Sequence, residues 1–191
     1  MNIFILSEDQ VTAAQMQCDK HVVKMIVESA QLLSNAHRVL DGKLMLKPSK
    51  SGKRMIKYWC LFEGADDLEA EILYYKAVHM GHPCTVWTTL SSGNYRWHYE
   101  HFVALCDEYT YRYGKVHKTD SLLRSALWTL PRNIDDGPLT PFALAMGSNP
   151  ECMFSDAVKS YRLYYKTKQD RFKMAWTNRN VPNWDMETVN G

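Results

Sequence analysis

Hydrophobic residues recur every three or four positions along much of the chain, the spacing that places them on one face of an α-helix. The clearest case lies between Asp19, which we expect to cap a helix, and Gly42, which we expect to end it. The apolar positions of this segment are Val22, Val23, Ile26, Ala30, Leu33 and Leu40. They predict a long amphipathic helix with one face in the core.

Further helices are predicted from residues that start and stop helices. Ser7 and Gln10 have the spacing of a capping box, so a short helix should follow an extended start over residues 2–6. Other helices are expected over residues 66–80, from Pro83 onward, over 95–113 before Gly114, and over 155–176. Residues 43–57 and 129–140 contain proline and glycine and are predicted loops. The predicted fold class is all-α, a single compact domain over residues 1–191 with about five to seven helices and a short extended N-terminus.

The composition narrows the possible classes of protein. With 191 residues, of which 46% are hydrophobic, the chain is long enough for one domain with a core. A net charge of +2 excludes an acidic disordered protein and a histone-like polycation. No apolar run reaches the roughly 18 residues of a membrane-spanning helix, and the N-terminus lacks the features of a secretory signal. We therefore expect a cytoplasmic monomer that does not bind membranes.

Basic residues gather in two segments. Six lie between Lys43 and Lys57 with no acid among them, and seven lie between Lys159 and Arg179 with Asp170 as the only acid. Tyrosines, a phenylalanine and a tryptophan interleave with the second group, an arrangement that suits phosphates and exposed bases. A solvated surface explains the charge alone equally well. DNA is thus a candidate partner rather than a necessary one.

A polar stripe follows the other face of the long predicted helix. Its members, three or four residues apart, are His21, Lys24, Glu28, Gln31, Asn35 and Arg38. A carboxylate among cations and a histidine is a plausible general acid/base with substrate-holding neighbours, although a solvated helix face gives the same pattern. His21 and Glu28 are two turns apart, about 10 Å, so they could flank one nucleotide but could not bond directly.

The same helix carries a resemblance to a known family. Asp19, Lys20 and His21, with Glu28 seven residues after the histidine, resemble the active-site helix of the pyrimidine-dimer DNA glycosylase (phage endonuclease V) family. Two further segments are similar in order and type. They are Gly81-His82-Pro83 with the helix through Cys106-Asp107-Glu108 to Arg112-Tyr113-Gly114, and the basic aromatic C-terminus with Tyr164-Tyr165-Lys166 and residues 176–184.

The resemblance implies an enzyme that excises a damaged or modified pyrimidine from double-stranded DNA and then nicks the abasic site. Its nucleophile is the N-terminal α-amine, which forms a Schiff base, and no cofactor is needed. An α-amine suits this chemistry because it is less basic than a lysine and more of it is neutral near pH 7. By position, Met1 supplies the amine, Glu28 is the acid/base and His21 is the nearby histidine. From the resemblance together with the basic segments, the predicted DNA-binding residues are Lys20, Lys24, Gln31, Arg38, His82, Lys166, Arg171 and Arg179.

Several features depart from the family pattern. Asn2 is too large for removal of the initiator residue, so we expect Met1 to be retained. Val27 and Gln31 stand where the family has arginines, and residues 43–57 and 119–150 have no clear counterpart. The excised base is therefore left open, and a modified phage base is one alternative. A non-catalytic DNA-binding module of the same fold is another.

A metal enzyme is the remaining alternative. His79 and His82, like His98 and His101, are three residues apart and could ligate a metal from one helix face. Neither pair has the H-E-x-x-H spacing, and no third ligand lies at a usual interval, so no metal site is predicted. The five cysteines form no C-x-x-C pair, and we expect reduced thiols.

Overall fold

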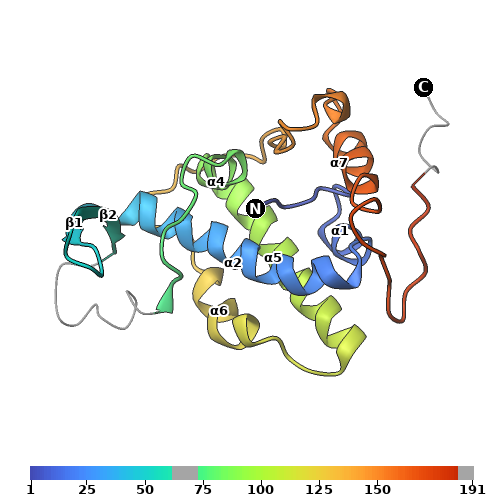
Figure 1. Cartoon of the computed structure of the whole chain (residues 1–191), viewed down its shortest axis with the longest axis horizontal. Helices are drawn as coiled ribbons and strands as arrows, with labels where there is room; N and C mark the ends of the chain where they lie inside the picture. Colours follow the sequence, from blue (N-terminus) through green and yellow to red (C-terminus); the bar gives the residue numbers. More distant parts are fainter. Residues whose placement is uncertain (62–72, 185–191) are drawn as a thin grey trace.

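The longest helix, α2 (Asp19–Asp41), runs through the middle of the molecule, and α5 (Ser92–Tyr113) crosses behind it (Figure 1). The computed structural model describes residues 1–61 and 73–184. Within these ranges the other helices are α1 (Gln10–Gln15), α4 (Pro83–Thr89), α6 (Lys118–Trp128), α7 (Ala157–Lys166) and the 3₁₀ turn η2 (Pro150–Cys152). The only strands there are β1 (Lys43–Pro48) and β2 (Met55–Cys60). The prediction of a mostly helical single domain is confirmed.

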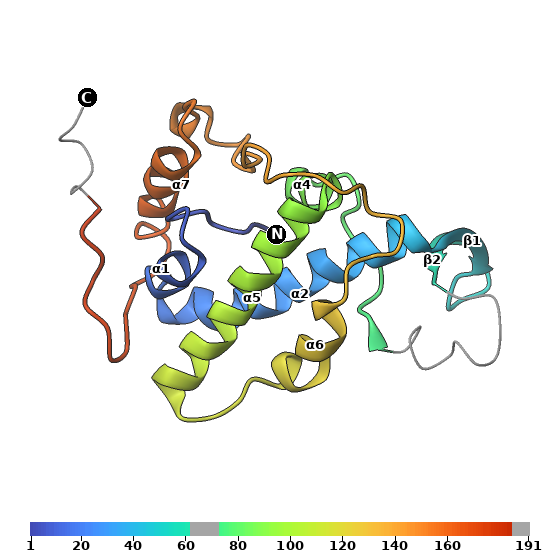
Figure 2. The ribbon, with the colours of Figure 1, turned by 180° about the vertical axis from the view of Figure 1, so that it is seen from behind.

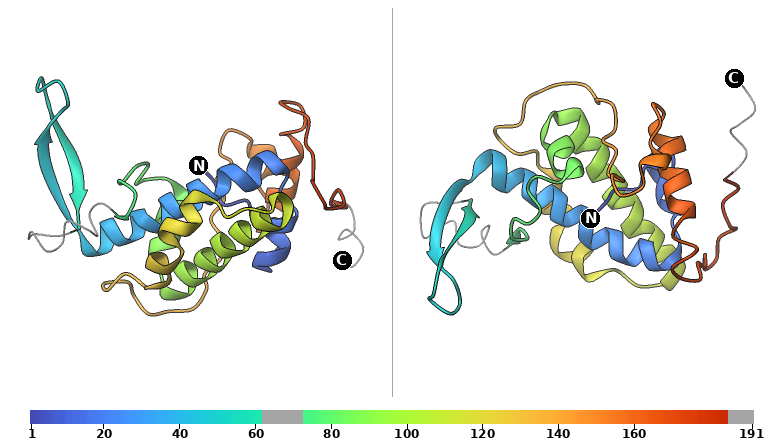
Figure 3. Two further views of the ribbon diagram at one scale, coloured as in Figure 1. Left: turned by 90° about the horizontal axis from the view of Figure 1, so that it is seen from below. Right: turned by 45° about the horizontal axis from the view of Figure 1, so that its top comes forward.

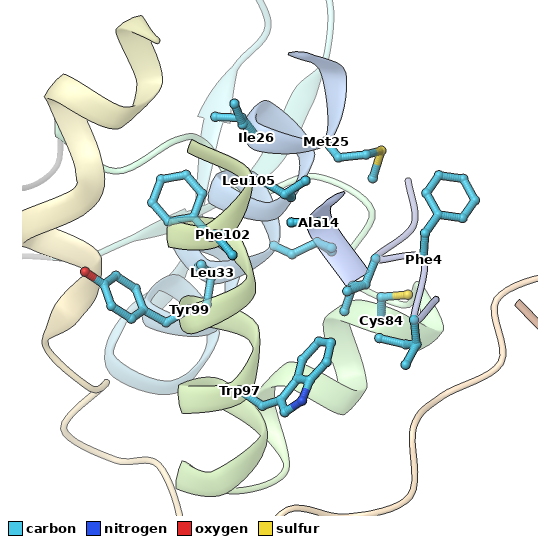
Figure 4. Packing of buried hydrophobic residues seen from close by; sticks show 14 of the residues in the cluster. Phe4, Ala14, Met25, Ile26, Leu33, Cys84, Trp97, Tyr99, Phe102 and Leu105 are labelled. Atoms are coloured by element: carbon cyan, nitrogen blue, oxygen red, sulfur yellow. The ribbon is translucent and has the colours of Figure 1, made fainter. Parts of the chain in front are cut away.

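The core lies where α2, α4 and α5 meet the N-terminal segment. Ile26 and Leu33 of α2 and Phe102 and Leu105 of α5 are buried together (Figure 4). Residues 3–6 are also buried, although they belong to no helix or strand. The view from behind shows this segment passing between α1 and α4 (Figure 2). The beginning of the chain is therefore held inside the domain rather than left as a free tail.

Several predicted helix boundaries are wrong by a few residues. Helix α1 is capped by Asp9, whose carboxylate accepts a 2.7 Å hydrogen bond from the Thr12 N–H, and not by Ser7. Asp19 is the first residue of α2 rather than its cap, and Val23 is exposed rather than part of the core. Helix α4 does begin at Pro83, and α5 ends at Gly114, which has a φ of +64°.

The predicted and observed helices differ more in segments whose conformation depends on tertiary contacts. The last predicted helix is shortened to Ala157–Lys166, and α6 was not predicted. Of the helix expected over 66–80, residues 66–72 lie outside the described ranges, and residues 74–79 are not helical. Their backbone carbonyls accept hydrogen bonds from side chains of α2, which hold them in an open conformation beside that helix.

The prediction that residues 43–57 form a loop is wrong. They form most of an antiparallel hairpin. Strand β1 pairs with β2 from Lys43 opposite Cys60 to Pro48 opposite Met55. The residues between the strands form a turn, in which Gly52 takes a φ of +71° that other residues rarely adopt. Leu44, Met45 and Leu46 form a short apolar run without apolar/polar alternation, so no period-two signal marks this strand in the sequence.

A buried ionic network ties the C-terminal segment to the start of α2. Arg112 donates to Glu108 at 2.7 Å and to Asp19 at 2.9 Å, and Arg179 donates to Glu108 at 2.8 Å. Burial raises the pKa of the Glu108 carboxyl, but hydrogen bonds from Arg179 and Arg112 outweigh it and leave the pKa below its ordinary value. The segment after α7 is thereby fixed near Asp19, with the Thr177 hydroxyl donating to the same carboxylate.

The buried histidines predict that acid destabilises the fold. Burial lowers the pKa of His98 from 6.5 to about 3 and that of His101 to about 4. Below pH 6.5 the unfolded chain binds protons that the folded chain does not, so stability falls as the pH decreases from 6.5 toward 4. Each such histidine contributes up to about 1.4 kcal/mol per pH unit in this window.

Thermal unfolding at several pH values between 7 and 4.5 should show this loss as a falling midpoint. The variant His98→Asn, which keeps a polar group near Thr88, should show a weaker pH dependence than the unmodified chain. Equal pH dependence in the two proteins would show that His98 does not contribute.

Candidate active site

Glu28 lies midway along α2, and its carboxylate faces the first two residues of the chain. Its Oε2 is 3.9 Å from the amine nitrogen of Met1 and accepts a 3.1 Å hydrogen bond from the Asn2 N–H. Its Oε1 pairs with the Lys24 Nζ at 3.0 Å, and the side chain is 15% exposed. The structure therefore brings Met1 and Glu28 together, as the hypothesis of an amine nucleophile with a carboxylate acid/base requires.

Asn2 fixes the segment that carries this amine. The side chain is 6% exposed, and its Oδ1 accepts hydrogen bonds from the N–H groups of Ile3 at 2.8 Å and Phe4 at 3.1 Å. Its Nδ2 donates to the Ala145 carbonyl at 3.0 Å. This local turn holds Phe4 at a φ of +57°, a conformation that costs free energy in a residue other than glycine. Such a strained conformation persists only because the surrounding contacts determine it.

His82, like Glu28, interacts with Met1. Its ring caps α4, with Nδ1 accepting from the Cys84 N–H at 3.2 Å. Burial lowers the pKa of His82, and the positive charge of the N-terminal amine lowers it further, while a hydrogen bond with the Met1 backbone opposes both effects. His82 therefore contacts the residue that carries the amine, in addition to any DNA contact that the resemblance implies.

His21 is buried among aromatic rings on one side of the same site. Its ring centroid is 5.0 Å from that of Phe4 and 5.5 Å from that of Phe172. The Tyr165 hydroxyl lies 2.6 Å from Nδ1, and it already accepts a hydrogen bond from the Cys18 N–H at 2.9 Å. The hydroxyl hydrogen is therefore best directed at Nδ1, which leaves the ring proton on Nε2.

The charge state of His21 follows from its surroundings. Burial lowers its pKa from 6.5 to about 4, and the positive charges of Lys24 and Lys168 act in the same direction. At neutral pH the ring is uncharged. His21 is suited to donating a hydrogen bond from Nε2, and it is not suited to acting as a general acid at neutral pH because its protonated form is scarcely populated there.

A pocket of about 290 Å³ opens over these groups, at the lower end of the range for small-ligand sites. Its lining combines the amine and carboxylate with three cations and three aromatic rings. These lining residues are Met1, Asn2, Phe4, His21, Lys24, Met25, Glu28, Ala145, Tyr164, Lys168, Arg171 and Phe172. Cations suit phosphate oxygens, and aromatic faces suit an unstacked base.

Lys168 belongs to this site, although it was not among the predicted site residues. Its side chain is buried, and Nζ lies 3.5 Å from the centre of the Tyr164 ring. The sequence signal was present in the four-residue spacing of Tyr164 and Lys168 within the second basic segment. The sequence alone did not distinguish Lys168 from the other six basic residues of that segment.

The remaining predicted DNA contacts are more scattered. Lys20 is exposed next to the pocket, with Nζ 4.6 Å from the centre of the Phe172 ring. Lys166 lies in the last turn of α7. Arg179 is paired with Glu108 and lies 4.1 Å over the Tyr111 ring, so its charge is largely used within the protein.

The prediction that Arg38 binds DNA is wrong. Its side chain is 1% exposed and donates to the carbonyls of Tyr75, Tyr74 and Trp59 at 2.6, 2.8 and 2.9 Å. Gln31 likewise donates to a backbone carbonyl, at 2.5 Å. The C-terminal half of the polar stripe therefore holds neighbouring backbone segments, and its N-terminal half faces the pocket.

A larger pocket of about 730 Å³ lies beside the start of α7, away from the amine. Its cation, Arg162, donates to the Leu6 carbonyl at 2.8 Å, and its carboxylates are Glu8 and Asp156. Asp156 caps α7. These groups favour a structural role, so the smaller pocket is the better candidate for chemistry.

The chain has no significant match among protein-family models, curated proteins or solved structures. Across residues 1–61 and 73–184, no three His, Cys, Asp or Glu side chains gather as metal ligands would. None of the helices in these ranges combines the length and apolar character needed to cross a membrane. The argument for function therefore depends on the geometry of the site.

The buried amide of Asn2 leads to a prediction about the site. Asn2→Ala leaves two N–H groups and one carbonyl without their partners, and it should lower the free energy of unfolding by about 1–3 kcal/mol. Denaturant unfolding measures the change. Gln10→Ala removes an amide from an exposed hydrogen bond to Glu100 and should change stability by less than about 0.5 kcal/mol. Similar losses in the two variants would contradict a special role for Asn2.

Proposed function

We propose that the protein is a DNA glycosylase that excises a damaged or modified pyrimidine through an imine with the Met1 amine and then nicks the abasic site. The observation that supports the proposal is the 3.9 Å approach of the Met1 nitrogen to the Glu28 carboxylate in a pocket of cations and aromatic rings. The resemblance of the α2 sequence to the endonuclease V family supports the same reaction.

The first step needs a neutral amine and a proton carrier. Glu28 is placed to take a proton from the Met1 ammonium, which frees the nitrogen lone pair to attack C1′ of the nucleotide. The bond between C1′ and the base breaks, and the base leaves with its electron pair and takes up a proton. The sugar ring then opens as its oxygen is protonated, and the nitrogen and C1′ form an iminium.

The iminium also makes the strand break possible. It draws electrons from the neighbouring carbon, so a proton can leave C2′ and the bond from C3′ to the phosphate oxygen can break. The phosphate departs with the electron pair of that bond, and water releases the sugar from the amine. Glu28 is the carboxylate nearest to this chemistry and is the proposed base.

The rest of the pocket has a binding role in this proposal. Flipping a base out of a duplex costs a few kcal/mol, and the cost is smallest where pairing is already damaged. Stacking on Phe4, Tyr164 or Phe172 would recover part of this cost, and Lys24 and Arg171 would hold the flanking phosphates. His21 would donate from Nε2 to a carbonyl of the flipped base.

Borohydride trapping on duplex DNA with an abasic site tests the proposal. The unmodified chain should form a covalent adduct because borohydride reduces the imine. Glu28→Gln should slow the trapping by roughly 10²–10⁴-fold, since proton transfer is lost. An added Gly-Ser before Met1 displaces the amine and should abolish the adduct, and intact mass measurement establishes the first residue of each protein.

Glu100→Gln is the matched control because Glu100 is an exposed carboxylate on α5. It should trap DNA as fast as the unmodified chain. Tight DNA binding without an adduct would favour the non-catalytic module instead. Undiminished trapping by the extended chain would exclude Met1 as the nucleophile. Release of bases from a panel of damaged and modified duplexes then identifies the substrate.

A further inference from the structure

The β1–β2 hairpin projects from the end of α2, toward the side of the molecule on which the N-terminus lies (Figure 3, left). The beginning of the segment after α7 extends to the same side at the other end of α2, before the chain turns back (Figure 3, left). The hairpin and its turn contain six basic residues and no acidic residue: Lys43, Lys47, Lys50, Lys53, Arg54 and Lys57. This charge stands outside the core and outside the candidate active site.

Three of the cations surround the tip of the hairpin. Lys50, Lys53 and Arg54 are exposed, and in the described part of the chain none of them pairs with a carboxylate. The turn itself is ordered, since the Ser49 N–H donates to the Arg54 carbonyl at 2.7 Å and the Gly52 N–H donates to Ser49 at 2.8 Å. The structure thus presents the charges on a defined turn.

The base of the hairpin is fastened to α2. The buried Arg38 guanidinium donates to the Trp59 carbonyl of β2 at 2.9 Å. Gly42 joins the helix to β1, and a Cβ at this position would lie 2.4 Å from the Arg38 carbonyl oxygen and 2.8 Å from that of Cys60. The close contact requires glycine and sets the direction in which the hairpin leaves the helix.

Apolar side chains accompany the cations. The strand register places Leu44, Leu46 and Met55 on one face together with Lys57. Leu44, Leu46 and Met55 are 49%, 60% and 56% exposed. A patch of exposed apolar groups on one face favours contact with a partner surface, and a partner that covers this patch must also accept the positive charge.

We propose that the hairpin is a second DNA-binding element, a basic ribbon that lies in a groove of the duplex to one side of the candidate active site. The inference rests on the proposed function only for the choice of DNA as partner. A two-stranded ribbon fits the major groove, about 12 Å wide, where apolar side chains contact thymine methyl groups and cations reach the phosphates. The Arg38 contact then serves to aim the ribbon.

The length of α2 sets the position of this contact. The hairpin begins beyond Asp41, 13 residues after Glu28, which is about 20 Å along a helix at 1.5 Å per residue. At about 3.4 Å per base pair, the ribbon would meet the duplex roughly six base pairs from the flipped nucleotide if the duplex follows α2.

The charge argues against a second copy of the chain as the partner. A symmetric dimer places the same patch of each copy against the other. Lys57 and the three tip cations of each copy would then approach those of the other, which costs free energy that three apolar side chains do not recover. The negative backbone of DNA has the complementary charge.

The test compares the salt dependence of binding to an undamaged, fluorescently labelled duplex. The slope of log affinity against log salt is negative, and the tip variant Lys50→Gln/Lys53→Gln/Arg54→Gln should make it shallower. Its magnitude should decrease by about two to three, since each lost phosphate contact contributes about 0.9. The control Arg96→Gln/Lys115→Gln/Lys118→Gln removes the same charge from exposed positions on α5, α6 and the turn between them, and should change the slope little.

Equal slopes in the tip variant and the unmodified chain, or equal decreases in the tip and control variants, would overturn the proposal. So would a dimer in sedimentation that Leu44→Ser/Leu46→Ser dissociates while the tip variant binds DNA normally. The outcome is separate from that of the proposed function. If no protein traps abasic DNA, a smaller slope in the tip variant still supports the ribbon, and if trapping succeeds, an unchanged slope still excludes it.

Discussion

The contact between the Glu28 carboxylate and the first two residues is the interaction on which the site depends. Chain ends are usually poorly ordered, but here residues 3–6 are buried and the Asn2 amide bonds to three backbone groups. The amine is consequently held at one place before any substrate binds. A reacting group that is already positioned does not lose that freedom during the reaction, which is a substantial part of enzymatic rate enhancement.

Helix α2 connects the site to its surroundings. Its N-terminal half carries His21, Lys24 and Glu28 to the pocket, while its C-terminal half uses Gln31 and Arg38 to hold backbone segments. Because one rigid helix carries both halves, the candidate active site and the base of the hairpin keep a constant separation. The duplex DNA proposed as the ligand has the length and the negative charge to contact both.

Local sequence was sufficient for much of the fold. The period of α2, the proline that starts α4 and the glycine that ends α5 are all signals contained in a few residues. The extended path of residues 74–79 could not be predicted because it depends on side chains of α2 about 40 positions earlier. The burial of Arg38 has the same cause. Met1 and Glu28 were placed together through the family resemblance, whereas the role of Asn2 depends on Ala145, which is 143 positions away.

The most direct measurement is peptide mapping of the adduct that borohydride forms with abasic DNA. After nuclease and trypsin digestion, fragmentation mass spectrometry should locate the sugar remnant on the α-amine of the Met1–Lys20 peptide. A remnant on the Nζ of Lys24 or Lys168, the other amines that line the pocket, would contradict the account. Glu28 would then assist a lysine nucleophile and not the Met1 amine, and the fixed position of the N-terminus would need another explanation.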